Sequence, residues 1–449
     1  MSRLFGTDGV RGVANSELTP ELVYKLGKVG AYVLSAEKER PVILICKDTR
    51  ISGDMLEDVI SAGILAMGGN VIKAGVLPTP AAAYLVRHYQ ADAGVVISAS
   101  HNLFEYNGIK FFNGDGFKLD DEIEDKIEDI IMRDIDVSSH ITGDKLGRCL
   151  NADEAAFNAY ANYLKASIDV DISGFKIVLD CANGAAYKIA EKVFSDLGAE
   201  VSVIANEPNG LNINLMCGST HPEALKKEVL NKKADIGLAF DGDADRLIGV
   251  DELGRIIDGD KMLCICAKML KDSGELKGNK ITATVMSNIG FHKAVEEMGA
   301  TLDITAVGDR YVLENMLKTG CVIGGEQSGH IIFLNRSTTG DGILSALQLV
   351  KAVKLSGEKS SVLSDRIKIY PQVLVNARVK NENRKKYAND KEIAAEIKKV
   401  EKLMAGDGRV LIRPSGTEPL IRVMIEGKEQ QKIKELAENL ADLITKKFG

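Results

Sequence analysis

The sequence has no long hydrophobic run. No stretch of about 18 uninterrupted apolar residues occurs in its 449 residues, so we expect no membrane-spanning helix and no membrane partner. The opening residues, MSRLFGTDGVRG, lack the apolar segment of a secretory signal peptide. These absences predict a protein of the cytoplasm.

Signs of a disulfide framework and of excess basic charge are also missing. The seven cysteines, odd in number and scattered, are typical of reduced thiols rather than of a disulfide framework. Cys264 and Cys266 form a Cys-x-Cys pair, but the surrounding KMLCICAKML is typical of a buried helix, which favours core packing over metal binding. The formal net charge of −7 argues against nucleic acid as the main partner, although it permits local basic pockets for a phosphate.

Three segments of the sequence, beginning at Pro41, Phe175 and Lys280, share one pattern. Each begins with a short β-branched run, continues through a polar loop into a helical period, and gives a second apolar run after a glycine. The glycines that end the three helices are Gly68 with Gly69, Gly198, and Gly299. A strand–helix–strand unit has this pattern and builds parallel sheets, with sites beyond the carboxyl ends of the strands.

The last part of the chain, from about Asp365, is more charged. Two strand-like runs, GRVLIRP and LIRVMIEG, and a final helix, KIKELAENLADLITKKF, predict a smaller α+β domain there. A chain of 449 residues has room for about three or four domains. We therefore predict an α/β fold: three related α/β domains with mixed or parallel sheets and a smaller C-terminal α+β domain, around a central cleft. The expected boundaries are 1–150, 151–254, 255–365 and 366–449.

A cluster of acidic residues follows one apolar run, in DIGLAFDGDADR. Asp241, Asp243 and Asp245 alternate with small residues, and three oxygen ligands at this density suit a hard cation such as Mg²⁺ or Ca²⁺. Three carboxylates so close together would repel one another in a partly dry loop without a cation. The competing interpretation is a solvated acidic turn.

A calcium EF-hand is a second alternative for this loop. Counting from Asp241, position 12 is Glu252, as that motif requires. Position 6, however, is Arg246 instead of the glycine that the motif needs, and the flanking residues are typical of strands. Three acids, one divalent ion and Arg246 sum to about zero charge, so the loop can still accept the dianion of a phosphate ester.

A second anion-binding pattern, RPSGTEPLIR, lies near the C-terminus. It combines hydroxyls, free backbone N–H groups and guanidinium groups, which are the parts of a phosphate site. The residues concerned are Arg413, Ser415, Gly416, Thr417 and Arg422. The alternative is a polar turn between two prolines. The sequence has no Walker phosphate loop, so a nucleotide-binding loop of that type is not expected.

Two further loops are weaker signals. In GGEQSGH, the side chains of Glu326 and Ser328 suit sugar hydroxyls, and His330 can move protons near neutral pH. In FGTDGVRG, Thr7 and Arg11 are available to an anion. Each of these loops taken alone is compatible with an ordinary glycine-rich turn.

Ser100 and His101 follow a β-branched run in VVISASHN. A serine hydrolase is not indicated, because triad partners rarely adjoin in sequence and Ser100 lacks a G-x-S-x-G elbow. A cation loop, a phosphate loop and a candidate sugar loop elsewhere in the chain favour a different role. Ser100 is then the carrier of a phosphoryl group.

The four patterns SASHN, DGDADR, GGEQSGH and RPSGTEPLIR, in this order, resemble the signature loops of the α-D-phosphohexomutases. The opening RLFGTDGVRG and the GGEQ form are most similar to the bacterial members that act on glucosamine phosphate. The resemblance implies an isomerase that interconverts glucosamine 6-phosphate and glucosamine 1-phosphate and feeds UDP-N-acetylglucosamine and cell-wall synthesis. The alternatives are a phosphoglucomutase/phosphomannomutase with the same mechanism and a non-catalytic sugar-phosphate binder.

The resemblance also implies cofactors and catalytic roles. Ser100 is the phosphoserine, and glucosamine 1,6-bisphosphate is the intermediate and activator. One Mg²⁺ per subunit is held by Asp241, Asp243, Asp245 and an oxygen on Ser100. The residues around the transferring phosphate are Arg11, His101, Lys110 and Arg246. Lys110 and His330 are the two candidates for the general base.

The remaining roles concern the sugar phosphate, which is the expected small-molecule partner. Glu326 and Ser328 are implied to bind sugar hydroxyls, and Val307, Gly308 and Asp309 belong to the loop AVGDR that faces the sugar. The phosphate that does not react is assigned to Arg413, Ser415, Gly416, Thr417 and Arg422. One departure is Leu103 in place of the family's usual proline, which predicts a less rigid serine loop. The sequence leaves open a homodimer.

Overall fold

The computed structural model describes residues 4–6, 8–34, 38, 40–137, 141–384, 386–404, 406–415 and 418–449. The chain divides into two compact units, each of which is described by itself. The first contains Met1–Met286 and Ala300–Asp365, and the second contains Ser287–Gly299 and Arg366–Gly449. Within the described ranges, no helix combines the length and apolar character that crossing a membrane requires.

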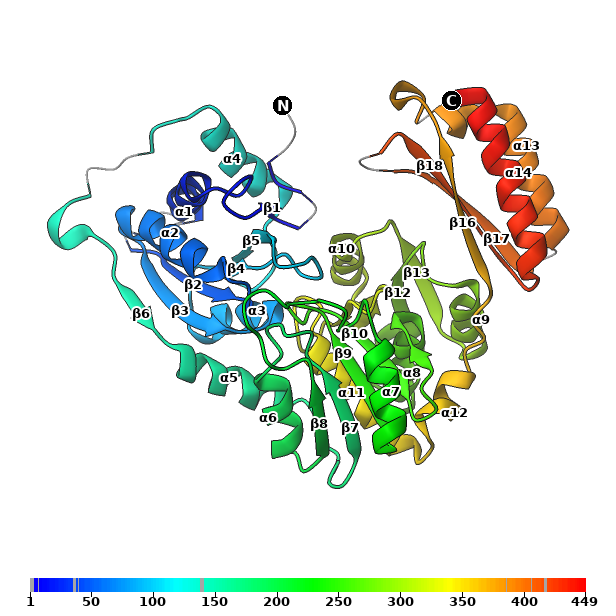
Figure 1. The fold of residues 1–449 in the computed structure, drawn as a ribbon, viewed down its shortest axis with the longest axis horizontal. Coiled ribbons are helices and arrows are strands. Elements are labelled where there is room, and N and C mark those ends of the chain that lie inside the picture. Colours follow the sequence, from blue (N-terminus) through cyan, green and yellow to red (C-terminus); the bar gives the residue numbers. More distant parts are fainter. Residues whose placement is uncertain are drawn as a thin grey trace. The chain divides into compact units, whose positions relative to one another are not determined.

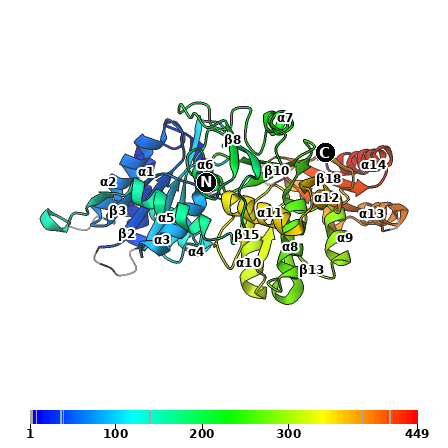
Figure 2. The same cartoon turned by 90° about the horizontal axis from the view of Figure 1, so that it is seen from below.

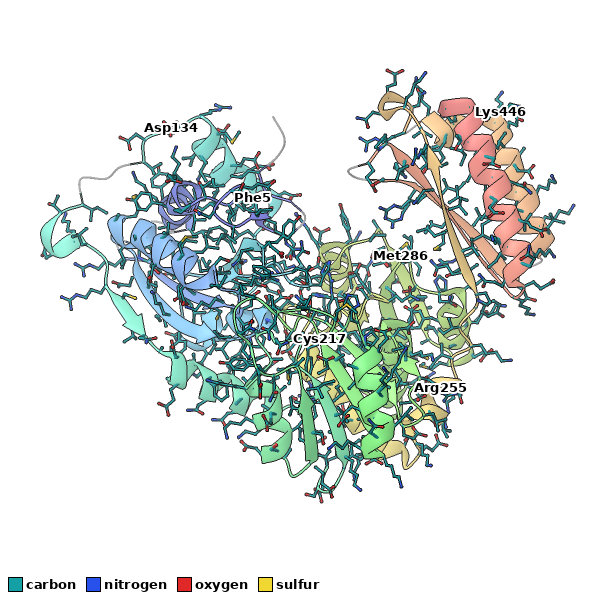
Figure 3. All side chains as sticks on the ribbon, in the orientation of Figure 1. Phe5, Asp134, Cys217, Arg255, Met286 and Lys446 are labelled. Atoms are coloured by element: carbon teal, nitrogen blue, oxygen red, sulfur yellow. The ribbon has the colours of Figure 1, made fainter. Side chains whose placement is uncertain are left out.

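The first sheet of the larger unit has six strands (Figure 1). In sheet order these are β1 (Val10–Val13), β5 (Tyr106–Asn113), β4 (Ala93–Ile97), β2 (Val42–Lys47), β3 (Asn70–Val76) and β6 (Cys149–Asn151). The pairs β2–β3, β2–β4 and β3–β6 are parallel, whereas β5 is antiparallel to both β1 and β4. Phe5, labelled in Figure 3, is 1% exposed and lies beside Phe111 in this domain's core.

Helices cover both faces of this sheet because each has one apolar face. Those on or near the sheet are α1 (Pro20–Leu34), α2 (Gly53–Ala66), α3 (Thr79–His88), α4 (Asp121–Met132) and α5 (Asp153–Lys165). Buried side chains of α1, α2 and α4, such as Leu26, Ile60 and Ile127, form one core cluster with the β-branched residues of the strands. Burying this apolar surface stabilises the domain and fixes the ends of its strands.

The second sheet has five strands in the same unit. In sheet order they are β11 (Ile256–Ile257), β10 (Leu247–Asp251), β9 (Ile236–Phe240), β7 (Lys176–Asp180) and β8 (Glu200–Ile204). The β7–β8 and β7–β9 pairs are parallel, and β9–β10 is an antiparallel hairpin. The accompanying helices are α6 (Ile189–Asp196) and α7 (Glu223–Lys232).

The third sheet has four strands, of which only the last is antiparallel to its neighbour. In sheet order they are β13 (Thr301–Thr305), β12 (Lys280–Thr284), β14 (Ile323–Gly325) and β15 (Ile331–Phe333). The helices of this part of the unit are α8 (Gly259–Asp272), α10 (Asp309–Thr319), α11 (Gly342–Ser356) and α12 (Ser360–Asp365). Helices α8 and α11 lie side by side in both views (Figure 1 and Figure 2).

The second unit consists mainly of an antiparallel sheet covered by two helices. Its strands, in sheet order, are β16 (Gln372–Arg378), β18 (Leu420–Gly427) and β17 (Gly408–Pro414). Its helices are α9 (Ile289–Glu297), α13 (Lys391–Met404) and α14 (Gln430–Phe448). The core between sheet and helices contains Val423, Ile425, Leu440 and Ile444.

The predicted α/β fold is confirmed. The pairs β2–β3, β7–β8 and β12–β13 are the parallel strands that the repeated pattern predicts, with a helix between them in sequence. Gly68, Gly198 and Gly299 have positive φ angles of 80°, 87° and 70° just past the ends of their helices, as the glycine signals predict. Cys264 and Cys266 are buried in α8, which confirms their packing role.

Candidate active site

Ser100 lies in the loop between β4 and β5, at the carboxyl end of a fully buried strand. Its side chain is inaccessible, and its φ angle of 52° is unusual for a residue other than glycine. The Ser100 hydroxyl donates a hydrogen bond of 2.7 Å to Asp241 Oδ2. The serine loop of the first sheet and the carboxylate loop of the second sheet therefore meet, although 141 residues separate them in sequence.

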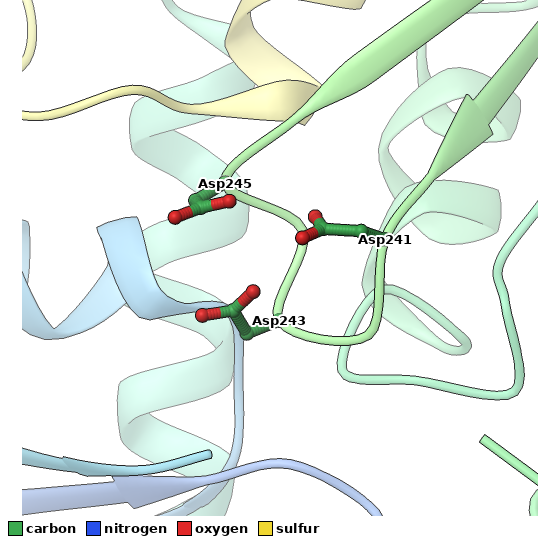
Figure 4. A group of neighbouring side chains, drawn as sticks. All are labelled: Asp241, Asp243 and Asp245. Carbon is green, nitrogen blue, oxygen red and sulfur yellow. The ribbon is translucent and has the colours of Figure 1, made fainter. Parts of the chain in front are cut away.

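The carboxylate loop joins β9 to β10. The Phe240–Leu247 pair closes the hairpin, and Ala244 turns the chain with a φ angle of 53°. Asp241, Asp243 and Asp245 are at most 4% exposed, and one ligand atom from each lies within 4.8 Å of the others (Figure 4). The flanking strands exclude the EF-hand alternative, which needs two helices.

The electrostatics of this loop fit a divalent cation. Within the described residues, Asp243 Oδ1 and Asp245 Oδ1 are buried without a hydrogen-bond partner. Burial, followed by repulsion from Asp245 and Asp243, raises the pKa of Asp241 well above its ordinary value. Oxygen ligands that are buried, unpartnered and mutually repelling are those that a hard cation would satisfy.

Two cationic side chains border the carboxylates. Lys110 Nζ is 1% exposed and lies 2.8 Å from Asp243 Oδ2 and 2.9 Å from Asp8 Oδ2. Burial alone lowers the pKa of Lys110, but Asp243 and Asp8 raise it above its ordinary value, so this amine stays protonated at neutral pH. Arg246 Nη1 lies 2.9 Å from His101 Nδ1, and its buried Nε has no hydrogen-bond partner among the described residues.

His101 and Arg11 complete the predicted set around Ser100. His101 Nδ1 lies 3.5 Å from the Ser100 hydroxyl. Burial, with Arg246 and Arg11 nearby, lowers the pKa of His101, so its imidazole is neutral at pH 7. Arg11 is placed by β1, where it pairs with Gly108 of β5, and it forms an ion pair with Asp8.

The predicted sugar loop joins β14 to β15. Glu326 N donates to His330 O over 3.0 Å, and Glu326 Oε1 accepts a hydrogen bond of 3.1 Å from Gly308 N. The predicted AVGDR loop and Glu326 are therefore in contact. Val307 is 39% exposed and Ser328 is exposed, so both are open to a ligand.

His330 is buried at 2% exposure and has contacts at both ring nitrogens. Its Nε2 accepts from Gly340 N over 3.1 Å, which leaves Nδ1 as the protonated nitrogen, 3.5 Å from Asp245 Oδ2. Both candidates for the general base, Lys110 and His330, are thus engaged with carboxylates of the cation loop.

The predicted C-terminal phosphate loop belongs to the smaller unit. Arg413 on β17 lies directly opposite Arg422 on β18. Burial and Arg422 lower the pKa of Arg413. Like charges placed opposite each other destabilise a strand pair, and a bound anion would offset this repulsion. Ser415 N donates to Leu420 O over 2.8 Å. The predicted Gly416 and Thr417, like Thr7, lie outside the described residues.

Sequence reasoning missed several residues that hold the predicted loops within each of the two units. Thr79 Oγ1, at the start of α3, donates to Asp243 Oδ2 over 2.6 Å, and Lys118 Nζ bridges Asp8 and Asp309 at 2.7 and 2.6 Å. Arg384 donates to Ser415 O over 3.0 Å. No local motif marks these residues, because their partners lie far away in the sequence.

The predicted sugar loop and the carboxylate loop are joined by a close backbone approach at Gly329. Leu247 N donates to Gly329 O over 3.0 Å, and a Cβ at Gly329 would lie 2.0 Å from Leu247 O. Gly329 also has a φ angle of 93°. Gly329→Ala is therefore expected to lower the free energy of unfolding by about 2–5 kcal/mol, from backbone strain and overpacking together.

The control for this prediction is Gly320→Ala. Gly320 has a similar φ angle of 72°, but nothing lies within 4 Å of an added Cβ. This variant should lose only the backbone contribution of about 1 kcal/mol. Thermal unfolding of both variants gives the comparison, and equal midpoints would show that the contact with Leu247 does not matter.

In comparisons with known protein families, four successive segments of the chain match four domains of one family. The chain matches the descriptions phosphoglucomutase/phosphomannomutase alpha/beta/alpha domain I, domain II, domain III and C-terminal domain. The matched residues are 2–137, 158–254, 258–370 and 374–443. The chain belongs to the phosphoglucomutase/phosphomannomutase family, which confirms the resemblance in its four loops.

Among the relatives, two bacterial proteins named phosphoglucosamine mutase are similar over the full chain. The protein of Clostridium kluyveri is 56% identical over 449 residues, and that of Thermoanaerobacter sp. strain X514 is 57% identical over 452 residues. Each alignment covers 100% of both chains.

Solved structures show the same fold at low sequence identity. A phosphoglucomutase/phosphomannomutase family protein from Burkholderia thailandensis has a TM-score of 0.82 at 22% identity, covering 100% of this chain and 99% of the other. Aspergillus fumigatus N-acetylphosphoglucosamine mutase, in complex with GlcNAc-6P and magnesium, has a TM-score of 0.70 at 17% identity and covers 99% and 96%.

Proposed function

We propose that the chain is an isomerase that interconverts glucosamine 6-phosphate and glucosamine 1-phosphate. The observation that carries this proposal is the 2.7 Å contact between the Ser100 hydroxyl and Asp241 in a buried carboxylate cluster. That contact places a nucleophile beside a site that suits a hard cation. The choice of glucosamine rests on the full-length similarity to proteins named phosphoglucosamine mutase.

The reaction consists of two phosphoryl transfers. Phosphorylated Ser100 gives its phosphoryl group to the C1 hydroxyl of glucosamine 6-phosphate: the bond from Ser100 Oγ to phosphorus breaks, a bond from the sugar oxygen to phosphorus forms, and the hydroxyl proton passes to Ser100 Oγ. The product is glucosamine 1,6-bisphosphate, the intermediate that also activates unphosphorylated enzyme. Ser100 then takes the C6 phosphoryl group, and the C6 oxygen regains a proton, so the cycle is proton-neutral.

The cofactor is one Mg²⁺ per subunit, held by Asp241, Asp243, Asp245 and an oxygen on Ser100. When bound, this ion neutralises the carboxylates and polarises the phosphoryl oxygens. Around it, Arg11, Arg246 and protonated Lys110 supply positive charge to the transferring group, and neutral His101 lies beside the serine. Protonation makes Lys110 a better proton donor than base. Gly340 N donates to Nε2 of His330, so the ring proton is on Nδ1, which faces Asp245 Oδ2. We therefore assign His330 the role of orienting Asp245 in the proposed site.

The sugar is recognised by the third sheet's loops. We assign its hydroxyls to Glu326 and Ser328 and its facing loop to Val307, Gly308 and Asp309. The hydrogen bond from Gly308 N to Glu326 supports this grouping, because it brings the two loops into one surface.

A coupled assay with the 6-phosphates of glucosamine, glucose and mannose tests the substrate. Glucosamine 6-phosphate is expected to give the highest kcat/KM; a preference for glucose or mannose phosphate would favour the alternative phosphoglucomutase/phosphomannomutase activity. Intact-protein mass spectrometry should find one phosphoryl group, mapped to Ser100, on the purified enzyme. A non-catalytic sugar-phosphate binder would show neither turnover nor this modification.

The loop of the smaller unit is proposed to bind the phosphate that does not react, through Arg413, Ser415, Gly416, Thr417 and Arg422. Arg422→Ala is expected to weaken sugar-phosphate binding about ten- to a hundredfold, because a charge-assisted contact is lost. Both reaction directions should weaken, since each half-reaction holds one phosphate there.

The same variant should release more of the bisphosphate, which must stay bound while it reorients. Phosphorus NMR of a running reaction measures this intermediate relative to product. Lys428→Ala is the matched control, because Lys428 is a cation of the same unit that pairs with Asp407 outside the loop. An effect on one direction only, without additional bisphosphate, would contradict a shared anchor.

Three further proposals concern the whole protein. The seven cysteines, odd in number and scattered along the sequence, support a cytoplasmic location, where the product would feed UDP-N-acetylglucosamine and cell-wall synthesis. The four separate sheets support four domains with the boundaries 1–150, 151–254, 255–365 and 366–449. A homodimer is the proposed assembly, and light scattering of the purified protein tests it.

A further inference from the structure

The backbone of Ser100 is held in an unusual conformation. Its φ angle of 52° lies in the left-handed region, which residues with a side chain occupy only when the surroundings enforce it. The residue is fully buried, and both its N–H and its C=O are hydrogen-bonded to side chains.

Arg50 is the main partner on the carbonyl side. The residue is 3% exposed, and all five N–H groups of the guanidinium are used. Nε donates to Asp48 Oδ2 over 2.8 Å. The other four donate to backbone carbonyls of the serine loop: Ser100 at 3.0 Å, Asn102 at 2.9 Å, Tyr106 at 3.0 Å, and Leu103.

The N–H side of Ser100 is connected to the same arginine. Ser100 N donates to Ser98 Oγ over 3.0 Å, and the Ser98 hydroxyl donates to Asp48 Oδ2 over 2.5 Å. Asp48 also accepts from Arg50 N over 3.0 Å. Ser100, Ser98, Asp48 and Arg50 are therefore linked in a closed ring of hydrogen bonds, to which Ser100 contributes its N–H and its C=O.

A loop that follows the second sheet's strand β8 contributes Asn214. Its amide Nδ2 donates to Ser100 O and to Asn102 O, both over 2.9 Å, and the residue is 2% exposed. Asn214 lies between β8 and α7, so it reaches the serine loop from the domain that carries the carboxylates. Its own φ angle of 58° suits asparagine or glycine.

We propose that Arg50, assisted by Asn214, is a positioning residue that fixes Ser100 at the carboxylate cluster for phosphoryl transfer. This inference rests on the proposed role of Ser100 as phosphoryl carrier. Arg50 touches neither substrate nor phosphoryl group and acts through the backbone of the loop. The same contacts, including that to Leu103 O, hold the loop where the family's usual proline is missing.

Arg50→Lys tests the proposal. Lysine keeps the charge, but its single ammonium cannot span four carbonyls and Asp48. We expect kcat to fall about 10- to 100-fold, because small misplacement of a reacting atom has effects of this size. KM for glucosamine 6-phosphate should stay within about twofold, because no substrate contact is removed. Transfer from glucose 1,6-bisphosphate to dephosphorylated Ser100, followed by mass spectrometry, should slow by the same factor.

Two variants accompany it. Asn214→Gly removes the amide while tolerating the positive φ angle, and it should lower kcat by a smaller factor with KM again unchanged. Arg255→Lys is the matched control: Arg255, labelled in Figure 3, also pairs with an aspartate (Asp251 Oδ2, 2.8 Å) and reaches a backbone carbonyl, but it lies on the turn between β10 and β11. This control should keep the parent's kcat.

The outcomes separate this inference from the proposed function. Parent-like kcat in Arg50→Lys, while the parent carries phosphorylated Ser100, would overturn the inference alone. Equal losses in Arg50→Lys and Arg255→Lys would also overturn it, because they would indicate general destabilisation. If Arg50→Lys does not fold, unchanged kcat in Asn214→Gly overturns the inference and a selective loss of kcat supports it. A parent that turns over without ever carrying phosphate on Ser100 would refute the proposed function itself.

Discussion

Ser100→Ala is expected to lower turnover by at least about 1000-fold, because covalent transfer needs the hydroxyl oxygen that lies 2.7 Å from Asp241 Oδ2. The change removes one hydrogen bond to Asp241 and leaves the backbone contacts of the loop in place. Sugar-phosphate affinity, measured by calorimetry, should survive, since the residues proposed to bind the sugar and the distant phosphate are untouched.

The matched control is Ser167→Ala. Ser167 is a buried serine of the same unit whose hydroxyl donates only to Leu164 O, so its removal should leave turnover near that of the parent. Near-normal turnover in Ser100→Ala would exclude the phosphoserine mechanism. Loss of both turnover and sugar binding would point instead to a folding defect.

Asp243→Ala is expected to abolish activity at ordinary Mg²⁺ concentrations, a loss of at least about 100-fold, and EDTA should inactivate the parent enzyme. Asp243 supplies one of the three carboxylates, and its Oδ2 also accepts from Lys110 and Thr79. The substitution therefore removes a cation ligand and leaves the buried ammonium of Lys110 with Asp8 as its remaining ion-pair partner. Asp243→Asn keeps the shape of the side chain and tests charge alone.

Asp341→Asn is the control for this prediction. Asp341 is a buried aspartate that accepts from Tyr160 Oη and Leu344 N, and burial raises its pKa to about 6. An asparagine can keep both contacts, because the tyrosine hydroxyl can accept as well as donate. Activity should persist. Full activity of the parent in EDTA would show that the carboxylate loop has no required cation.

The residues of the chemical site are predictable from sequence because each lies in a short local pattern. Asp241, Asp243 and Asp245 follow one strand, and the density of charge is visible without any knowledge of the fold. The contacts of Arg50 and Asn214 with the serine loop are not predictable in this way, since they are made to backbone carbonyls 50 to 114 residues away, which leave no trace in the sequence.

In the fold, too, some elements are predictable from local sequence and others are not. The repeated strand–helix–strand pattern predicts the parallel pairs because β-branched runs and helix-ending glycines are local signals. Strand β16 is missed because Val373, Leu374 and Val375 are consecutive apolar residues, so its sequence does not show the alternating exposure that the strand has. Helix α13 is missed for another reason. Only Ile393, Val400 and Met404 are buried, so its apolar face is narrow and most of its sequence is charged.

The backbone contact between Gly329 and Leu247 has a consequence for engineering the specificity of this protein. The loop assigned to the sugar and the strand that leaves the cation loop are bonded to each other, so a change in the shape of residues 324–330 will also move Asp245 and Arg246. Substrate choice and metal affinity will therefore change together when that loop is redesigned. Val307 is a position where a change should affect the cation loop less. It is exposed, and its neighbour Gly308 contacts residues 324–330 through the side chain of Glu326, not through the backbone bonded to Leu247. Variants that are selected for a new sugar should therefore first be changed at Val307, where we expect the affinity for Mg²⁺ to stay constant.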